Sequence, residues 1–235
     1  MIKDIINLEC TCVVPFYNEG NRVREVIIAL KKVKNISQII CVDDGSESLD
    51  TASQIKKEFK DIVLVRLPKN KGKSAAVKAG LDLVKTPLVI LIDADLKGLK
   101  KSEIEHSINA MKTDKSLGMV ILKRIKEPWY IKLTRWDTLV SGERVLYTDD
   151  LRQIYKRDFF LKNQIEYAIN RYMMVNNKKV RWAPSSAENV YKIYKYGIIS
   201  GILQDLKIHL EYIKYGGVIF SLRSYFLFCT KSVGY

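Results

Sequence analysis

Residues 88–95 have the sequence Leu-Val-Ile-Leu-Ile-Asp-Ala-Asp, and this stretch is the most informative part of the chain about its fold. The apolar run follows Pro87 and is rich in β-branched residues, a pattern typical of an interior strand of a parallel sheet. Asp93 and Asp95 come at its carboxyl end, where open α/β sheets bind their ligands. Two carboxylates one residue apart can share one divalent cation and leave coordination positions for phosphate oxygens. The stretch therefore favours a metal-bound diphosphate, although an isolated Asp-x-Asp is more often a solvated turn.

The same kind of run recurs through the first half of the chain and alternates with amphipathic stretches. Strands are predicted at residues 10–14, 38–42, 62–67, 88–92 and 118–122. Helices are predicted between them at residues 23–33, 51–59, 74–84 and 103–111. This alternation predicts an α/β fold with a mostly parallel, doubly wound sheet flanked by helices.

The second half of the sequence is less regular. Residues 123–142 suggest a loop-rich connection, 165–175 a helix, 179–183 a short strand ended by Pro184, and 199–213 a helix stopped by Gly216-Gly217. No linker is evident. We expect one domain over residues 1–197, with a nucleotide-binding half at 1–122 and an acceptor half at 123–197. Residues 198–235 would then form a C-terminal helical extension.

The net charge of +14 is unevenly distributed along the chain. Residues 121–235 hold 20 of the 40 Lys and Arg but only 10 of the 26 Asp and Glu. This excess favours an anionic partner, such as a phosphorylated acceptor or an acidic membrane surface. Nucleic acid is not expected, because the chain contains no recognisable nucleic-acid-binding motif.

Cysteine usage and hydropathy bear on the compartment. Cys10, Cys12, Cys41 and Cys229 have no zinc-site spacing and suggest buried thiols in a reducing compartment. The N-terminus lacks a signal-peptide layout, and no window approaches the about 20 apolar residues of a spanning helix. We expect a cytoplasmic location.

Polar residues also follow the first two predicted strands. Pro15 cannot donate to a ladder, so pairing should stop there and release Tyr17 and Glu19 toward a ligand. The Tyr17 ring could stack on a nucleobase, and Glu19 could accept a hydrogen bond from a base or ribose, although this is also a common helix entry. Asp43 and Asp44 end the second strand, where a carboxylate could accept from base N–H groups or ribose hydroxyls, or could simply cap a turn.

A basic, glycine-containing loop precedes the predicted helix 74–84. Gly72 permits close backbone approach, the helix N-terminus favours negative charge, and Lys71 or Lys73 could meet a phosphate. It is not a Walker A motif, because the required first glycine, separated from Gly72 by four residues, is absent. All four features fall at the carboxyl ends of successive strands, and their conjunction is much more specific than any one of them.

Together these motifs resemble the family 2 glycosyltransferases with the GT-A fold, over residues 9–122. The motifs are Val14-Pro15-Phe16-Tyr17-Asn18-Glu19, Val42-Asp43-Asp44-Gly45-Ser46, Asn70-Lys71-Gly72-Lys73 and Asp93-Ala94-Asp95. The resemblance implies a donor that is a UDP- or GDP-linked sugar. By the same resemblance, Pro15, Tyr17, Glu19 and Asp43 would hold the nucleoside, with Asp44, Lys73 and Ala94 beside the nucleotide. Asp93 and Asp95 would bind Mg²⁺ or Mn²⁺ on the diphosphate.

Ser141-Gly142-Glu143-Arg144-Val145-Leu146 is similar to a stretch of dolichyl-phosphate mannose synthase-like and glucosyl-3-phosphoglycerate synthase-like enzymes. By that similarity Arg144 would hold an anionic acceptor or the donor diphosphate; the alternative is a structural arginine paired with Asp149 or Asp150. Glu166 would be a general base or would orient the acceptor, or else it is a solvated helix residue. Asp149 and Asp150 are rival bases that could equally cap a helix.

Two features of the second half leave the function open. Related sequences often carry a metal-binding histidine where this chain has Asn189, whose amide oxygen is a weaker ligand. Residues 218–228 are apolar and aromatic, with Arg223 and Lys231 nearby. This composition fits a helix on the inner membrane face, a core-packed helix or a homodimer seam. A metal-dependent glycosyltransferase is expected, for which a phosphorylated or polyprenyl-phosphate acceptor is a candidate. The alternative is a catalytically weak nucleotide-sugar-binding or membrane-associated scaffold.

Overall fold

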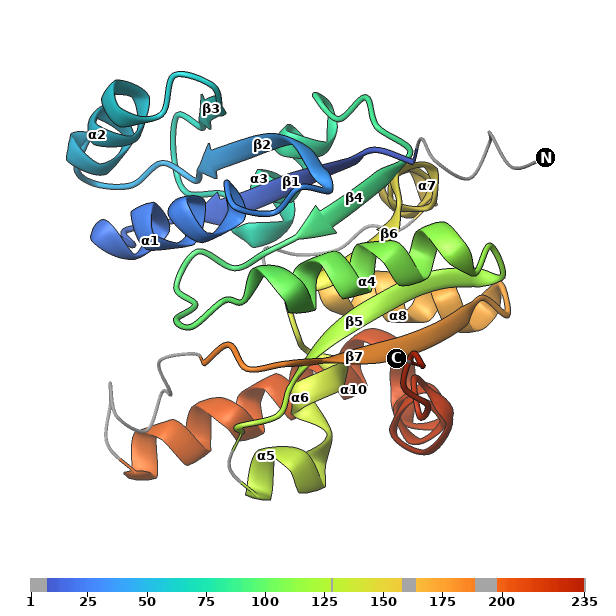
Figure 1. The fold of residues 1–235 in the computed structure, drawn as a ribbon. Helices are drawn as coiled ribbons and strands as arrows, with labels where there is room; N and C mark the ends of the chain where they lie inside the picture. Colours follow the sequence, from blue (N-terminus) through green and yellow to red (C-terminus); the bar gives the residue numbers. More distant parts are fainter. Residues whose placement is uncertain (1–7, 128, 158–163, 189–197, 235) are drawn as a thin grey trace.

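The computed structural model describes residues 8–127, 129–157, 164–188 and 198–234, which form a mixed sheet covered by helices on both faces (Figure 1). Within these residues the sheet has seven strands in the order β3-β2-β1-β4-β6-β5-β7. The strands are β1 (Cys10–Phe16), β2 (Ile36–Asp43), β3 (Val63–Arg66), β4 (Leu88–Leu91), β5 (Leu117–Arg124), β6 (Arg144–Tyr147) and β7 (Lys179–Ser185). Only β6 runs antiparallel to its neighbours in this sheet, so the predicted mostly parallel α/β sheet is confirmed.

Helices cover both faces of the sheet and bury two apolar cores against it. They are α1 (Asn21–Leu30), α2 (Asp50–Glu58), α3 (Lys73–Leu81), α4 (Lys101–Thr113), α5 (Trp129–Thr134), α6 (Trp136–Leu139), α7 (Thr148–Arg157), α8 (Ile165–Val175) and α10 (Ile198–Leu227). Buried residues of α1 and α4 form one core, on the near face in Figure 1. Those of α3, α7 and α8 form the other. Because both faces are covered, the central strands are nearly continuous apolar runs, which is why the sequence pattern located them.

Prolines in two strands do not end them as predicted. The carbonyl of Val13 accepts from the amide of Ile92 in the segment after β4, while the amide of Asp44 donates to Phe16 on the β2 side. Successive residues of a strand direct their backbone groups to opposite sides, so the nitrogen of Pro15 points toward the β4 side, where pairing has already finished. The β1–β2 ladder therefore continues to Phe16. The prediction that pairing stops at Pro15 holds on one side only.

The predicted end of the last strand at Pro184 is wrong, because β7 continues through it to Ser185. Ser185 faces β5, since its carbonyl accepts from the amide of Ile125. Pro184 therefore faces the outer edge of the sheet, where its missing N–H removes no bond to β5.

Strand β6 was not predicted from the sequence, and it determines the shape of the site. It pairs antiparallel with both β4 and β5, and Arg144 at its start lies opposite Leu91 and Ile121. The amino end of β6 therefore lies at the same sheet edge as the carboxyl ends of β4 and β5. Its carboxyl end at Tyr147 lies at the opposite edge, opposite Leu88.

The C-terminal residues return to the sheet after a broken helix. Gly217, with φ of 80° and ψ of 167°, interrupts α10 where Gly216-Gly217 was predicted to stop it. The segment after α10 then bonds to β7: the amide of Trp182 donates to Lys231, and the amide of Val233 donates to Trp182. Short helices α5 and α6 lie in the connection predicted to be loop-rich. All four cysteines are free and buried, as predicted.

Candidate active site

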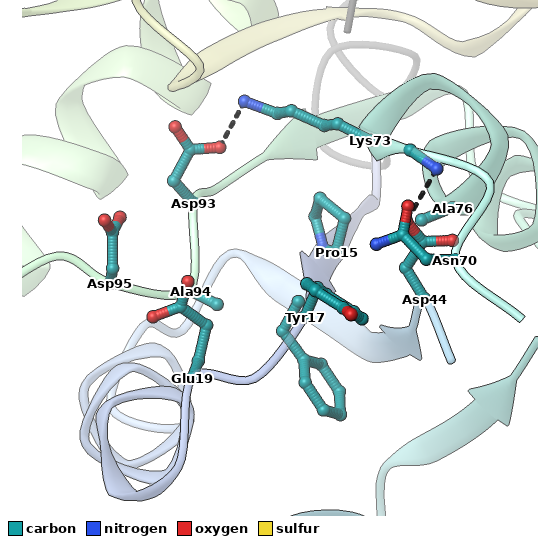
Figure 2. Close-up of a pocket in the computed structure, with 12 residues that line it drawn as sticks. Pro15, Tyr17, Glu19, Asp44, Asn70, Lys73, Ala76, Asp93, Ala94 and Asp95 are labelled. Carbon is teal, nitrogen blue, oxygen red and sulfur yellow. Dashed lines mark hydrogen bonds and ion pairs between the residues drawn. The ribbon is translucent and has the colours of Figure 1, made fainter. Parts of the chain in front are cut away.

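The carboxyl ends of β1 and β4 and the start of α3 surround a pocket of about 350 Å³ (Figure 2). It is lined by Pro15, Phe16, Tyr17, Glu19, Asp44, Asn70, Gly72, Lys73, Ala76, Asp93, Ala94 and Asp95. Eight of these are nucleotide-site residues expected from the sequence: Pro15, Tyr17, Glu19, Asp44, Lys73, Asp93, Ala94 and Asp95. All four motifs therefore contribute residues to one concave site, with Asp44 coming from the motif after β2.

The loop after β1 is tied to the loop after β2 by reciprocal hydrogen bonds. The amide of Asn18 donates to the Ser46 hydroxyl at 3.0 Å, and the amide of Glu47 donates to Oδ1 of Asn18 at 2.9 Å. Between them Tyr17 keeps 37% of its surface exposed, and its ring stands beside Pro15 in the pocket. Glu19 pairs with Arg22 at 2.7 Å. The loop therefore presents a ring face and a carboxylate to a ligand on a braced backbone.

Asp44 organises the loop that precedes α3. Its two carboxylate oxygens accept hydrogen bonds from the amides of Lys71 and Gly72, at 2.9 and 2.7 Å. These two amides, in the loop expected to approach a phosphate, are thus bound by a side chain of the protein itself. Lys71 is exposed and does not line the pocket, whereas Lys73 does.

Gly45 makes this close approach of two loops feasible. Its φ is +70°, and a Cβ there would lie 2.5 Å from the carbonyl carbon of Lys69. Any other residue would push residues 69–70 away from β2, and with them the loop that Asp44 holds.

Asp43, expected to contact the nucleoside, is not among the lining residues. It is fully buried, and its Oδ1 accepts from the amide of Ser46 at 2.8 Å. Its Oδ2 binds the guanidinium of Arg66 at 2.5 Å, and the same guanidinium donates to the carbonyl of Ser46. In this structure Asp43 closes the turn after β2, so its direct role is to shape the loop.

Lys73 connects the two carboxylates at the base of the pocket. Its ammonium forms an ion pair with Asp93, and a second with Glu166 of α8 at 2.7 Å. Burial alone would lower the pKa of Lys73, but Asp93 and Glu166 outweigh it and raise that pKa. Burial likewise opposes ionisation of Asp93, yet Lys73, Arg124 and Arg144 hold its pKa below the usual range. Lys73 and Asp93 are therefore both charged at neutral pH. Glu166 is bound to the charged ammonium of Lys73.

A buried polar cluster lies behind Asp93 and was not predicted. A Cβ on Gly142 would collide with the carboxylate of Asp93, so the amino end of β6 packs directly against that side chain. Glu143 is fully buried, accepts from the Ser141 hydroxyl at 2.8 Å, and pairs with Arg124 at 3.4 Å. Burial raises the pKa of Glu143. The sequence could have pointed to Glu143 through its place in the Ser-Gly-Glu-Arg stretch, which resembles the family 2 enzymes.

Arg144 is fully buried and does not line the pocket. Its guanidinium donates to the carbonyl of Ser141 and to Oδ1 of Asn170, the latter at 3.0 Å. The alternative of a structural arginine agrees with these contacts, but its partners are not Asp149 or Asp150, because those residues follow the far end of β6. Arg144 instead joins the start of β6 to α8, where its guanidinium also donates to the backbone carbonyl of Glu166 at 3.5 Å.

Asp149 lies at the edge of the sheet opposite the pocket, because it follows the carboxyl end of antiparallel β6. Its side chain is 88% exposed and pairs with Arg152. Asp150 binds the hydroxyl of Tyr172 and the ammonium of Lys178. The structure therefore does not bring either residue to the pocket, and the expected role of Asp149 as a catalytic base does not fit this position.

The donor set for a metal consists of Asp93 and Asp95, whose carboxylates lie on the same side of the segment after β4 (Figure 2). In the described ranges no group of three His, Cys, Asp or Glu residues forms a metal site by itself. Asn189 lies outside the described residues. One or two carboxylates plus substrate phosphate oxygens is nevertheless the usual ligand set of Mg²⁺, so the residues present fit a cation that binds together with a diphosphate.

Curated relatives match part of the chain. An undecaprenyl-phosphate 4-deoxy-4-formamido-L-arabinose transferase from Edwardsiella ictaluri is 30% identical over 139 residues, 55% of this chain and 41% of that protein. A dolichyl-phosphate beta-glucosyltransferase from Trichomonas vaginalis is 32% identical over 105 residues, 40% of this chain and 32% of that protein. The chain thus spans less than half the length of these relatives.

Solved structures share the fold over nearly the whole chain. Glucosyl-3-phosphoglycerate synthase from Mycobacterium tuberculosis, in complex with phosphoglyceric acid, has a TM-score of 0.71 at 14% identity, covering 93% of this chain and 85% of that one. A mannosyltransferase from Pyrobaculum calidifontis, in complex with GDP-Man and Mn²⁺, has a TM-score of 0.66 at 16% identity, covering 88% and 63%. These likenesses show the fold alone and agree with the expected GT-A architecture.

The family model described as Glycosyl transferase family 2 matches residues 11–182. This range runs from β1 to β7 and contains every lining residue of the pocket. The chain therefore belongs to glycosyltransferase family 2.

Proposed function

We propose that this chain transfers a sugar from a UDP- or GDP-linked donor to an anionic acceptor, with Mg²⁺ or Mn²⁺ held by Asp93 and Asp95. The observation that carries the proposal is the convergence of the four motifs, from the ends of β1, β2 and β4 and the start of α3, on one pocket. Solved neighbours with the same fold are described in complex with Mn²⁺ and UDP, and with GDP-Man and Mn²⁺. Their printed ligands support the class of donor but do not choose between the two bases.

The pocket suggests an orientation for the donor. Tyr17 and Pro15 offer apolar surface to a base, and Glu19 offers an acceptor for base or ribose donors. Asp93, Asp95 and Lys73 lie on the other side of the pocket, where they would meet the diphosphate (Figure 2). The sugar would then lie toward Glu166 and the acceptor half of the chain.

In the proposed transfer, the bond between the anomeric carbon and the diphosphate oxygen breaks, and its electron pair leaves with the nucleoside diphosphate. A new bond forms between the anomeric carbon and an oxygen of the acceptor. Lys73 is positively charged and would stabilise the negative charge that develops on the leaving group. A bound Mg²⁺ or Mn²⁺ would supply Lewis-acid assistance to the same leaving group.

The acceptor decides whether a base is needed. A phosphate oxygen is already ionised and attacks without losing a proton, whereas a hydroxyl must pass its proton to a carboxylate. Glu166 is the carboxylate of the acceptor half that reaches Lys73, so it is the candidate to receive that proton or to orient the acceptor. Relatives named for undecaprenyl-phosphate and dolichyl-phosphate, and a neighbour bound to phosphoglyceric acid, support a phosphorylated acceptor.

The test is calorimetry of UDP, GDP and ADP against the intact chain, each with Mg²⁺, Mn²⁺ or a chelator. We expect one nucleotide to bind only with metal, and Asp95→Asn to weaken that binding by about tenfold or more. Asp82→Asn is the matched control, because Asp82 makes an exposed pair with Lys78 at the far end of α3. It should leave the affinity unchanged.

Release of free sugar from the matching nucleotide sugar, slow but dependent on metal, would support transfer over simple binding. Nucleotide affinity that is equal with metal and with chelator would remove the metal from the proposal. Tight metal-dependent binding with no release of sugar, and no transfer to any phosphorylated acceptor, would favour the nucleotide-sugar-binding scaffold instead.

A further inference from the structure

The second half of α10, after the break at Gly217, exposes an apolar face. Within the described residues its outward side chains keep more than half of their surface accessible: Val218 62%, Ile219 76%, Leu222 53%, Phe226 66% and Leu227 66%. On the inward side Ser224 and Phe228 are buried, and Phe220 packs on Tyr212 with ring centroids 5.5 Å apart. The segment therefore has apolar residues on two sides, one that packs into the protein core and one that is left outside.

Helix α5 extends this surface. The hydroxyl of Tyr225 donates to the carbonyl of Leu133, so the second half of α10 and α5 are in contact. Leu133 itself is 64% exposed, and the neighbouring Lys132 is exposed as well. We call the exposed side chains of Leu133, Val218, Ile219, Leu222, Phe226 and Leu227 the α10 face.

The position of the α10 face is fixed by Arg135. Its guanidinium donates to the carbonyls of Tyr225, Phe228 and Cys229, at 2.8 Å for Phe228 and 3.2 Å for Cys229. These are the carbonyls that the end of a helix leaves without intrahelical partners. The apolar residues are thus presented on an anchored helix that Arg135 caps.

Charge around the α10 face has one sign. After Glu211 the sequence contains no acidic residue, while Lys214, Arg223 and Lys231 are all exposed. A second copy of the chain would bring the same positive charges together across a two-fold interface, in a protein whose net charge is already +14. An anionic surface would be complementary to these charges.

We propose that the α10 face lies on an anionic phospholipid bilayer, its apolar side chains at the headgroup boundary and Lys214, Arg223 and Lys231 near lipid phosphates. Amphipathic helices with basic flanks bind in this way, through buried apolar area plus attraction to anionic lipid. No helix in the described part of the chain is long and apolar enough to cross a bilayer. The contact is therefore one of lying on the surface.

The first experiment is co-sedimentation of the intact chain with vesicles, without nucleotide or metal. We expect at least about tenfold more binding to vesicles that contain phosphatidylglycerol than to pure phosphatidylcholine, and loss of this preference at high salt. Leu222→Glu combined with Phe226→Glu should abolish binding. Lys214→Ala combined with Arg223→Ala should lower only the binding to anionic vesicles.

The matched control carries the same number of new charges on exposed apolar positions elsewhere: Leu49→Glu, 60% exposed, combined with Val175→Glu, 71% exposed. It should bind vesicles almost as the wild type does. Thermal unfolding of each variant shows that it is folded, and because no nucleotide is present the result is independent of the proposed transfer activity.

Three results would overturn the proposal. The first is equal binding of the wild type to both kinds of vesicle, or to neither. The second is equal loss of binding in the α10-face variant and its control. The third is a homodimer in sedimentation equilibrium without vesicles that Leu222→Glu with Phe226→Glu dissociates, which would assign the α10 face to a second copy.

Discussion

Lys73 holds two carboxylates that come from different halves of the chain, and this makes it the most informative single residue to change. Lys73→Met would leave Asp93 and Glu166 without their shared cation, although the side chains of both are largely buried. Loss of one partner from such a group should lower the free energy of unfolding by about 3 kcal/mol. Urea denaturation at pH 7 measures this change.

Metal addition gives the same variant a second readout. In the wild type Lys73 already neutralises Asp93, so Mn²⁺ alone should stabilise the free protein little, and Mn²⁺ with the matching nucleotide should stabilise it strongly. In Lys73→Met, Mn²⁺ alone should restore part of the lost stability. Lys78→Met on the same helix removes only an exposed pair with Asp82 and should cost less than about 0.5 kcal/mol, with no response to Mn²⁺. A Lys73→Met protein as stable as Lys78→Met would contradict the importance of this ion pair.

The pKa shifts at the same residues give a pH dependence. The folded-state pKa of Asp93 is lowered, so its contribution is complete above the ordinary carboxyl pKa of about 3.9 and is lost as the pH falls through the lower folded value. The folded-state pKa of Lys73 is raised, so its contribution is complete below about 10.4 and is lost above its folded value. The stability difference between wild type and Lys73→Met should therefore be present at neutral pH and shrink as the pH falls, because the variant's unpaired buried carboxylates lose their charge when they take up protons. A difference that grew below pH 4 would contradict this assignment.

Residues next to strand ends were predictable, and their partners were not. Tyr17, Lys73, Asp93 and Asp95 stand in short motifs whose position after a strand can be read from a few neighbouring letters. The partners of Arg144 depend on the antiparallel direction of β6 in the sheet, and no local sequence pattern predicts that direction. The partners considered in the alternative interpretation, at positions 149–150, are close in sequence but lie at the opposite edge of the sheet.

At the scale of elements, the contact between the β2 loop and the loop before α3 depends on Gly45. Gly45→Ala would introduce both a strained φ and a clash with the backbone of Lys69. Gly98→Ala separates the two effects, because Gly98 has the same φ of +70° but a Cβ there would be 3.7 Å from the nearest atom. We expect Gly45→Ala to be less stable than Gly98→Ala by about 1–3 kcal/mol, since overpacking adds to the shared backbone strain.

The affinity for nucleotide provides a second comparison between Gly45→Ala and Gly98→Ala. Moving residues 69–70 shifts the loop that Asp44 holds and, with it, the start of α3 where Lys73 stands. Gly45→Ala should therefore bind the matching nucleotide about tenfold more weakly than Gly98→Ala, by calorimetry. Equal affinities in the two variants would show that the loop contact does not position Lys73.

Element prediction failed where packing, and not local pattern, decides the structure. Strand β6 has only the four residues Arg144–Tyr147, and its ends are an arginine and a tyrosine. Such a sequence shows neither a long apolar run nor clear alternation. Residues of β1, β2 and β4 are buried on both faces and gave unmistakable runs. Pro184 misled because a sequence does not show which side of a strand is the free edge.

For the whole molecule, the boundaries expected at residues 122 and 197 do not coincide with separate cores. One apolar core contains Val13 and Val89 of the first half, Leu146 of the second, and Tyr212 and Phe228 of the C-terminal segment. The strand order also mixes the two halves, since β6 of the second half lies between β4 and β5 of the first. We therefore expect residues 8–234 to unfold as one cooperative unit, even though the first half alone carries the pocket.

Calorimetry with and without nucleotide tests this cooperativity. A ligand at about 100 times its Kd stabilises a folded protein by about 2.7 kcal/mol, which for a domain of this size raises Tm by about 5–10 °C. If the chain is one unit, Mn²⁺ with the matching nucleotide should move a single transition as a whole, although all lining residues lie before residue 96. Asp95→Asn should unfold in one transition that the same ligand concentration moves by about half as much or less. Two transitions, of which only one responds to nucleotide, would instead show that residues 123–235 fold independently of the pocket. The shared core and the ion pair between Lys73 and Glu166 argue against that outcome, because unfolding of either half would expose the other's buried face and leave a buried charge unpaired.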